Sequence, residues 1–428
     1  MKGYIALSVL GFISHIAVCH PEALQEDPAR HNYQARGIIK PIFDPAAQRV
    51  EVTGKHAFVA PGPGDQRGPC PGLNAMANHN YIPRNGVATI QQLVEGCNKA
   101  YGMGHDLALV LALYSCVIAG NAVEESIGGD SPRVIGSPLG IPHGLSFSHN
   151  KFETDASPTR GDLYQYGDAS KVQMPQFNKL YRMGNRTTNY NLDIIHAFYA
   201  IRLAQSKSEN PRFFHPAVAG VLLVGAYNFI YRLFANHSAE HSDGFLDQET
   251  LKSFYAISGD GDNMTYMPGH ERIPSIWYKR HFTDEYTVVQ ANLDVLRAVT
   301  KYPQFLQIGG NTGSKNSFIG VDPANLTGGV YTAKNLLQGN NLGCFIIQVL
   351  QQAMPDLVKG LMKALTDAVT TVVGSVLNNT SILKCPQITM YDKSLYSIYP
   401  GYTELLPDGT YTGLSQLVRM LWPGLRRF

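Results

Sequence analysis

The sequence predicts a mainly α-helical protein, with one large helical domain followed by a C-terminal helical extension. Apolar residues recur at the i, i+3, i+4 and i+7 spacing of an amphipathic helix over residues 90–97. Residues 107–114 are almost all apolar, which indicates a buried central helix. Helical stretches also cover residues 195–206 and 216–234. A long apolar face over residues 358–376 predicts a helix packed on the domain rather than on a membrane surface, because basic residues are few there.

The composition is that of a globular protein with a sizeable core. The chain has 428 residues, of which 44% are hydrophobic and 16% charged. This length suits one large domain or two ordinary ones. The formal net charge is only +2, and no cluster of lysine and arginine stands out. The charge pattern therefore argues against nucleic acid and against an anionic membrane as partners.

The N-terminus predicts secretion. A lysine at position 2 precedes a mostly apolar stretch over residues 4–18, and polar residues follow from position 20. This pattern is typical of a signal peptide, which we place at residues 1–19. The run is short for a membrane span, so we expect none in the mature chain; an uncleaved anchor is the alternative. Residues 20–55 are polar and irregular, with the X-Pro steps Lys40-Pro41 and Asp44-Pro45 among them, so we expect an extended arm or a propeptide there.

The sequons agree with a secreted, N-glycosylated protein. They stand at Asn185, Asn236, Asn263, Asn325, Asn378 and Asn379.

The cysteines also fit an oxidising compartment. Cys344 and Cys385 are both in the C-terminal region and could form one disulfide that closes a long loop. Cys97 and Cys116 lie in helical, apolar surroundings and are interpreted as buried free thiols. A bridge between these two stays open as an alternative.

Cys70 is flanked by two prolines, in the sequence Pro69-Cys70-Pro71. A proline is favoured at the first position of a helix, so Pro71 predicts a helix that begins directly after the cysteine. The free N–H groups of that helix would face the sulfur and favour a thiolate, which can bind a metal or act as a nucleophile. A buried or disulfide-bonded cysteine is the alternative.

Residues 56–86, which surround Cys70, resemble the fungal haem-thiolate peroxidases, the family of chloroperoxidases and unspecific peroxygenases. The resemblance implies that Cys70 is the axial iron ligand of haem b. It implies a peroxidase domain over residues 56–335, with the C-terminal extension at 336–428. It further implies a secreted enzyme that uses H₂O₂ to oxidise or hydroxylate small aromatic or apolar substrates. A pathway-specific oxidase of fungal secondary metabolism and a haem-binding relative with reduced catalysis are the alternatives.

A second motif of that family matches residues 153–157, which read Glu-Thr-Asp-Ala-Ser. Taken alone, these residues could be a helix N-cap with solvated carboxylates. The resemblance implies that Glu153, the carbonyl of Thr154 and Ser157 bind Mg²⁺ or Mn²⁺ beside a haem propionate. Oxygen ligands suit such hard cations. Asp155 and Glu153 are also the candidate catalytic carboxylates.

The family's distal glutamate has no counterpart here. That residue moves a proton between the two oxygens of peroxide. The match to residues 225–230 places Ala226 at its position and Ala219 at the position of an associated arginine. Other acid–base candidates are Asp155, His215, Tyr227 and Asn228. For His215 a purely structural role is the commoner interpretation.

Overall fold

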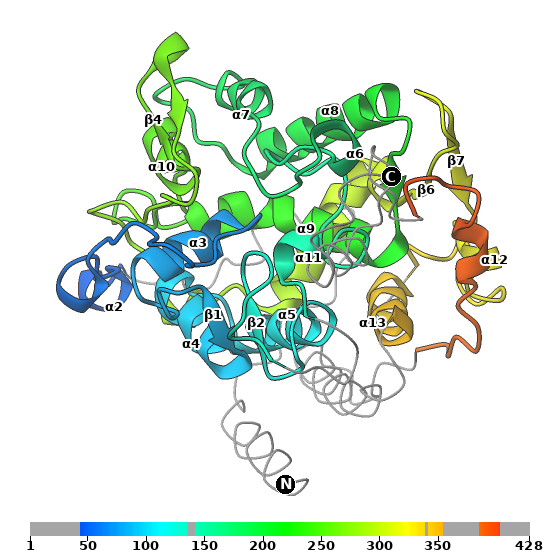
Figure 1. The fold of residues 1–428 in the computed structure, drawn as a ribbon, viewed down its shortest axis with the longest axis horizontal. Coiled ribbons are helices and arrows are strands. Elements are labelled where there is room, and N and C mark those ends of the chain that lie inside the picture. Colours follow the sequence, from blue (N-terminus) through cyan, green and yellow to red (C-terminus); the bar gives the residue numbers. More distant parts are fainter. Residues whose placement is uncertain (1–42, 136–141, 339–340, 354–384, 403–428) are drawn as a thin grey trace, which may run out of the picture.

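The computed structural model describes residues 43–135, 142–338, 341–353 and 385–402. The described part is mainly helical, which confirms the predicted fold class (Figure 1). The predicted signal peptide, the helix expected over 358–376 and the sequons at Asn378 and Asn379 lie outside the described residues.

Helix α9 (Ala217–Phe234) is the central element of the fold (Figure 1). It packs against α8 (Leu192–Glu209), α11 (Val288–Lys301) and α13 (Asn341–Ala353). The helix is long and apolar enough to cross a membrane, with a mean hydropathy of 1.6, yet 72% of it is buried inside the protein. Burial on nearly all sides is what an apolar core helix requires.

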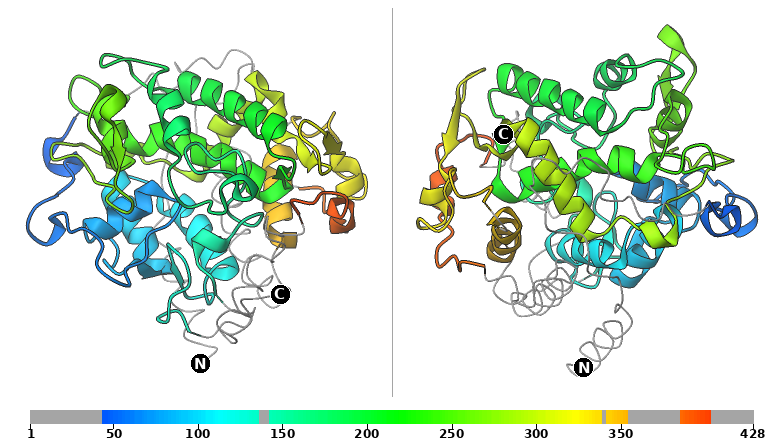
Figure 2. Two further views of the ribbon diagram at one scale, coloured as in Figure 1. Left: turned by 45° about the horizontal axis from the view of Figure 1, so that its top comes forward. Right: turned by 180° about the vertical axis from the view of Figure 1, so that it is seen from behind.

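The N-terminal part of the domain contains the helices α3 (Pro71–Asn78), α4 (Ile90–Tyr101) and α5 (His105–Ile118). Helix α4 begins at a capping box between Thr89 and Gln92 and ends at Gly102, whose φ of 67° suits glycine. Helices α4 and α5 pack side by side, as Figure 2 also shows. Both were predicted from their apolar patterns.

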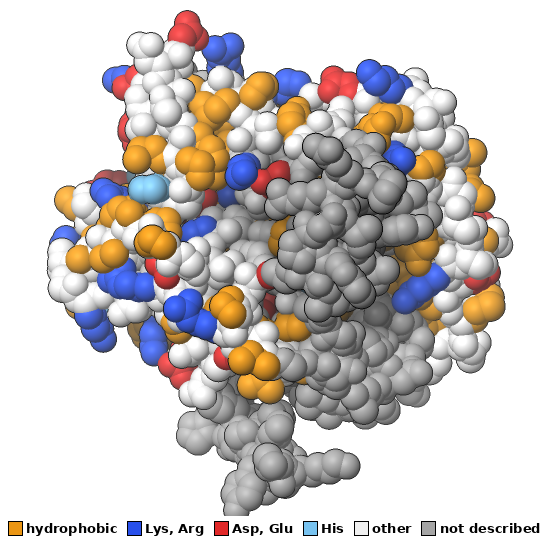
Figure 3. Space-filling view, viewed as in Figure 1, with side chains coloured by type: hydrophobic (Ala, Val, Ile, Leu, Met, Phe, Trp, Pro, Cys, Tyr) orange, Lys and Arg blue, Asp and Glu red, His pale blue; other side chains and the backbone are white. Residues whose placement is uncertain are grey.

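The remaining elements are short. In the described part of the chain the other α-helices are α2 (Pro45–Gln48), α6 (Leu163–Tyr166), α7 (Met174–Tyr181), α10 (Gln248–Phe254) and α12 (Pro323–Leu326). The same residues form three small antiparallel sheets. In these sheets β1 (Val87–Thr89) pairs with β2 (Glu124–Ser126), β4 (Ile257–Ser258) pairs with β5 (Thr265–Tyr266), and β6 (Ile308–Asn311) pairs with both β3 (Phe214–His215) and β7 (Phe318–Val321). On the face drawn in Figure 3, acidic and basic side chains are interspersed.

The end of the predicted N-terminal arm belongs to the core. Val50 is buried, and Gln48 donates hydrogen bonds from its side-chain amide to the carbonyls of His237 and Lys279, at 3.2 and 3.1 Å. The expectation of an extended arm or propeptide over 20–55 therefore differs from the structure at residues 45–50, where α2 forms and Gln48 and Val50 are buried. This packing could not be predicted from the polar composition of the segment. The buried amide of Gln48 is satisfied by backbone carbonyls that are distant in the sequence.

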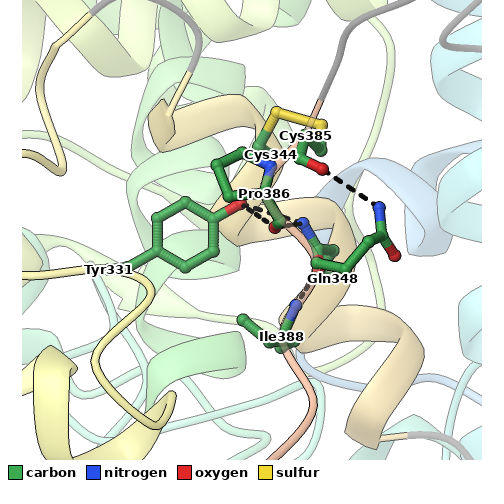
Figure 4. The surroundings of a disulfide bond; sticks show 7 residues. Tyr331, Cys344, Gln348, Cys385, Pro386 and Ile388 are labelled. Carbon is green, nitrogen blue, oxygen red and sulfur yellow. Dashed lines mark hydrogen bonds between the residues drawn. A yellow bond between two sulfur atoms is a disulfide. The ribbon is translucent and has the colours of Figure 1, made fainter.

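The predicted disulfide between Cys344 and Cys385 is confirmed (Figure 4). It joins α13 to residues 385–402. Beside it, Gln348 donates to the carbonyl of Pro386 at 2.7 Å and accepts from the N–H of Ile388 at 2.7 Å. Cys97 and Cys116 are free thiols, as expected; Cys116 is buried and Cys97 half-buried.

The extension shares the core of the main domain. Tyr396 and Tyr399 pack against Phe214, with ring centroids 5.1 and 5.3 Å away. The amide of Asn150 also donates to the carbonyl of Gly401 at 2.7 Å. Described residues of the extension therefore cover one side of the segment that leads to Glu153.

A buried carboxyl group on β2, that of Glu125, predicts that the free energy of unfolding depends on pH. Glu125 is 1% exposed and accepts a hydrogen bond from the hydroxyl of Ser115. Burial raises its pKa from 4.5 to about 8, against the effect of that hydrogen bond. Between these values the folded state binds more protons than the unfolded state, so stability falls as pH rises, by about 1.4 kcal/mol per pH unit. We expect Glu125→Gln to remove this decrease of stability with rising pH, because glutamine does not titrate.

The measurement is urea unfolding at pH 5 and pH 8. Glu125→Gln should narrow the difference between the two unfolding free energies, whereas the control Glu124→Gln, on the half-buried neighbour, should not. An equal pH dependence in wild type and Glu125→Gln would contradict the assignment.

Candidate active site

Cys70 is the N-cap residue of α3, and Pro71 is the first residue of the helix. The predicted local structure is therefore confirmed. The N–H groups of Leu73 and Gly72 act on the sulfur and favour the thiolate, as does the charge of Arg160. Burial is the larger influence and raises the pKa of Cys70 above its usual value, which corrects the expectation of a thiolate stabilised by the helix alone. A thiolate at this position needs a cation beside it, so the site suits a metal ligand better than a free nucleophile.

The loop before Cys70 is fixed by one asparagine. Asn74 accepts a hydrogen bond from the N–H of Gly68 at 2.9 Å and donates to the carbonyl of the same residue at 3.0 Å. A side chain at Gly68 would place its Cβ 1.9 Å from the carbonyl oxygen of Ile127, so only glycine fits. The position of the sulfur is thus set by close backbone packing as well as by α3.

The predicted cation-binding segment is buried. Glu153 is 9% exposed, and within the described part of the chain neither of its carboxylate oxygens has a hydrogen-bond partner. The hydroxyl of Ser157 donates to the carbonyl of Thr154 at 3.2 Å, so the three predicted ligands come from one tight turn. Burial raises the pKa of Glu153, against the effects of His149 and Arg160. A buried carboxylate without donors is costly, and a hard cation would satisfy it.

His149 is a member of this site that the sequence interpretation missed. Its ring lies between two carboxylates, with Nδ1 3.8 Å from Glu153 Oε2 and Nε2 3.6 Å from Asp155 Oδ1. Burial lowers the pKa of His149, but Asp155 and Glu153 outweigh it and raise the pKa to about 9. The spacing of four residues before Glu153 was its only signal in the sequence, and no helix forms there.

Asp155 is held on one side only. Its Oδ2 accepts from the N–H of Phe214 at 3.1 Å and from the amide of Asn210 at 3.3 Å. Its Oδ1 faces His149 and accepts no hydrogen bond from any residue that the structure describes. Burial, followed by the charge of Asp162, raises the pKa of Asp155 to about 7. Asp155 is thus a carboxyl group with one fixed and one available oxygen.

Asp162 fixes the turn from the other end. The amide of Asn210 donates to both Asp162 and Asp155, at 3.0 and 3.3 Å. Further donors to Asp162 are Arg202, Ser206 and the N–H of Ala156, at 3.3, 3.0 and 3.0 Å. This carboxylate is engaged in holding the chain, in contrast to Asp155 Oδ1 and the two oxygens of Glu153, which accept no hydrogen bond from the described residues.

Three other acid–base candidates are engaged in the core. His215 contacts the carbonyl of Gln307 through Nδ1 at 2.7 Å and the hydroxyl of Tyr199 through Nε2 at 3.1 Å, and burial lowers its pKa to about 4. Tyr227 donates to the carbonyl of Ala156 at 2.7 Å. These contacts engage both nitrogens of the His215 ring and the hydroxyl of Tyr227 within the core.

Asn228 is engaged in the same way. Its Oδ1 lies 2.7 Å from Nε2 of His196, and both residues are fully buried. This contact joins α9 to α8.

Helix α9 has a less buried apolar stripe that contains Ala226. Its members share the i, i+3, i+4, i+7 spacing of one helix face: Leu222, Gly225, Ala226 and Phe229. Among the residues that the structure describes, a Cβ at Gly225 would come within 4 Å only of the ring of Phe229, at 3.8 Å. Ala219, in contrast, is completely buried. The two alanines therefore lie in different surroundings.

Comparisons with known proteins identify the family. Residues 56–282 match the model of "Peroxidase, family 2". The chain is 36% identical to the aromatic peroxidase fscJ of Fusarium equiseti, over 91% of this chain and 93% of the relative. It is 39% identical to the dothistromin biosynthesis peroxidase dotB of Dothistroma septosporum, over 94% and 99% of the two chains. An aromatic peroxygenase of Cyclocybe aegerita is 32% identical over 61% and 65%. The protein therefore belongs to peroxidase family 2, the haem-thiolate family of chloroperoxidases and peroxygenases, and is an oxidoreductase.

Proposed function

We propose that this protein is a pathway-specific peroxidase of fungal secondary metabolism, which uses H₂O₂ to oxidise an aromatic substrate. The observation that carries the proposal is the extent of similarity. The aromatic peroxidase fscJ and the dothistromin biosynthesis peroxidase dotB match over more than 90% of both chains, whereas the C. aegerita peroxygenase matches over 61% of this one. This favours the biosynthetic alternative over a general secreted peroxygenase.

In this proposal Cys70 binds the iron of haem b. Haem with a thiolate ligand supplies the activation of peroxide for oxidation of organic molecules. The described residues divide the remaining tasks. Asn74 and Gly68 fix the loop that presents the sulfur. The stripe around Ala226 offers apolar surface to a substrate, and Asp155 Oδ1 is the acceptor available for a proton.

Secretion and glycosylation stay part of the proposal. The first is supported by the N-terminal sequence, which lies outside the described residues. Among the described sequons, Asn185, Asn263 and Asn325 are exposed, whereas Asn236 is half-buried and accepts a hydrogen bond from the N–H of Tyr278 at 2.9 Å. Asn236 is therefore the poorest of these acceptors.

Gene deletion together with turnover in vitro tests the function. Deletion in the producing fungus should cause an aromatic precursor to accumulate. The purified holoenzyme with H₂O₂ should consume that precursor faster than an aliphatic substrate of similar size. Equal turnover of aliphatic and aromatic substrates, with no accumulated precursor, would favour a general peroxygenase instead.

We further propose that Glu153, the Thr154 carbonyl and Ser157 bind one Mg²⁺ or Mn²⁺. Glu153→Gln keeps the size of the side chain and removes its charge, so the site loses its only carboxylate ligand among these three. We expect the variant to lose the cation and to retain haem less well, because a propionate beside it would be less neutralised. Elemental analysis should find about one such ion per haem in the wild type.

The matched control is Glu125→Gln, a buried glutamate outside this turn. It should keep the full metal content. A Glu153→Gln protein with one ion per haem would contradict the ligand assignment.

A further inference from the structure

A buried glutamate, Glu271, lies between the Cys70 loop and the segment that contains the Glu153–Ser157 turn. Glu271 is 0% exposed and comes from the segment between β5 and α11. Its Oε1 accepts from the amide of Asn74 at 3.0 Å and lies 3.4 Å from Nη2 of Arg160. Its Oε2 has no hydrogen-bond partner among the residues that the structure describes.

On one side, Glu271 is connected to the loop of Cys70. Asn74, which donates to Glu271, also makes both hydrogen bonds to Gly68. One turn later on α3, the amide of Asn78 donates to the carbonyls of Gly269 and Glu271, at 2.7 and 2.8 Å. Asn74 and Asn78 are four residues apart and share a helix face. Side chain and backbone of Glu271 are thus attached to the helix that begins at Cys70.

On the other side, Glu271 is paired with Arg160. Arg160 is 3% exposed, follows Ser157 by three residues, and donates from Nη1 to the hydroxyl of Thr159 at 3.1 Å. The guanidinium therefore links Glu271 to the residues that directly follow the Glu153–Ser157 turn.

We propose that Glu271 is a positioning residue, which couples the Cys70 loop to the Glu153–Ser157 turn through Asn74 and Arg160. The inference rests on the proposed haem site at Cys70. Glu271 has two effects there. Through Asn74 it fixes the loop that carries the sulfur. Through its charge it balances Arg160, which would otherwise leave an extra positive charge buried near the thiolate.

The two effects predict different results for two variants. Glu271→Gln keeps the shape and removes the negative charge, so the reduction potential of the iron should shift upward. Haem should also dissociate about 10-fold faster, as is usual for loss of an outer-shell partner. Asn74→Ala loosens the loop without changing charge, so haem should dissociate faster with little shift in potential. Glu271→Asp keeps the charge, so its reduction potential should stay near that of the wild type.

The control is Asp294→Asn, which breaks another buried carboxylate–arginine pair. Asp294 lies 2.7 Å from Nε of Arg232, on α11 and α9. This variant should lower thermal stability without moving the potential. The experiment is spectroelectrochemistry and haem transfer to an acceptor globin, on holoenzyme whose ferrous–CO complex shows the red-shifted Soret band of thiolate ligation.

The outcomes separate the two proposals. A wild type without the red-shifted band overturns the haem-thiolate site, and the role of Glu271 with it. A wild type with that band, together with a Glu271→Gln protein of unchanged potential and haem dissociation, overturns only the role of Glu271. An equal shift in Asp294→Asn also overturns it, since the effect would then be general. If Glu271→Gln does not fold, Glu271→Asp decides the question, because it keeps the charge. A reduction potential of Glu271→Asp that differs clearly from that of the wild type would then overturn the charge argument.

Discussion

Replacing Cys70 with alanine is expected to abolish the red-shifted Soret band of the ferrous–CO complex, and to release haem on gel filtration. The physical reason is the position of the sulfur. It lies at the start of α3, faced by the N–H groups of Gly72 and Leu73, in a loop that Asn74 fixes on both sides of Gly68. No other thiol among the described residues has this setting, because Cys97 and Cys116 lie within helices.

Cys97→Ala is the matched control for this prediction. Cys97 is also a free thiol, and its sulfur contacts that of Met76 on α3 at 4.0 Å. The control should keep both the haem and the red-shifted band. A Cys70→Ala protein with the spectrum of the wild type would remove the basis for a thiolate-ligated haem at this position.

The sequence predicted those elements that depend on residues close to one another in the chain. The apolar character of residues 107–114 and 216–234 predicted α5 and α9, because a core helix must be apolar over most of its surface. Pro71 predicted the start of α3, since proline lacks only an N–H that the first turn does not use. The pairing of Cys344 with Cys385 was proposed from their common region and is confirmed.

The contacts that complete the site could not be predicted in this way. Asn74 and Glu271 are 197 residues apart in the sequence, and an Asn or Glu in isolation carries no periodic signal. His149 joins Glu153 and Asp155 through a turn rather than through a helix face. The net effect on the pKa of Cys70 was also missed, because burial depends on the whole fold whereas the helix N–H groups are local.

On the distal side, the resemblance to the family places Ala226 at the position of the family's glutamate. We expect the wild type to react slowly with H₂O₂, because loss of a general acid–base group costs about 10²–10⁴-fold in rate. Ala226 lies on the less buried stripe of α9, beside Gly225. Because Ala226 is only half-buried, a longer side chain is easier to accommodate there than at the completely buried Ala219.

Ala226→Glu should accelerate the first spectral change after mixing with H₂O₂ in a stopped-flow instrument. Ala226→Gln is the matched control, since it fills the same space and cannot take up the proton. Acceleration by both variants would point to a change in pocket shape instead of proton transfer. A wild type that reacts as fast as relatives with the glutamate would show that another group already moves the proton. Asp155 is then the residue to replace first, because its buried Oδ1 lies 3.6 Å from Nε2 of His149 and accepts no hydrogen bond from the described residues. A loss of about 10²-fold or more in Asp155→Asn would assign the proton transfer to it.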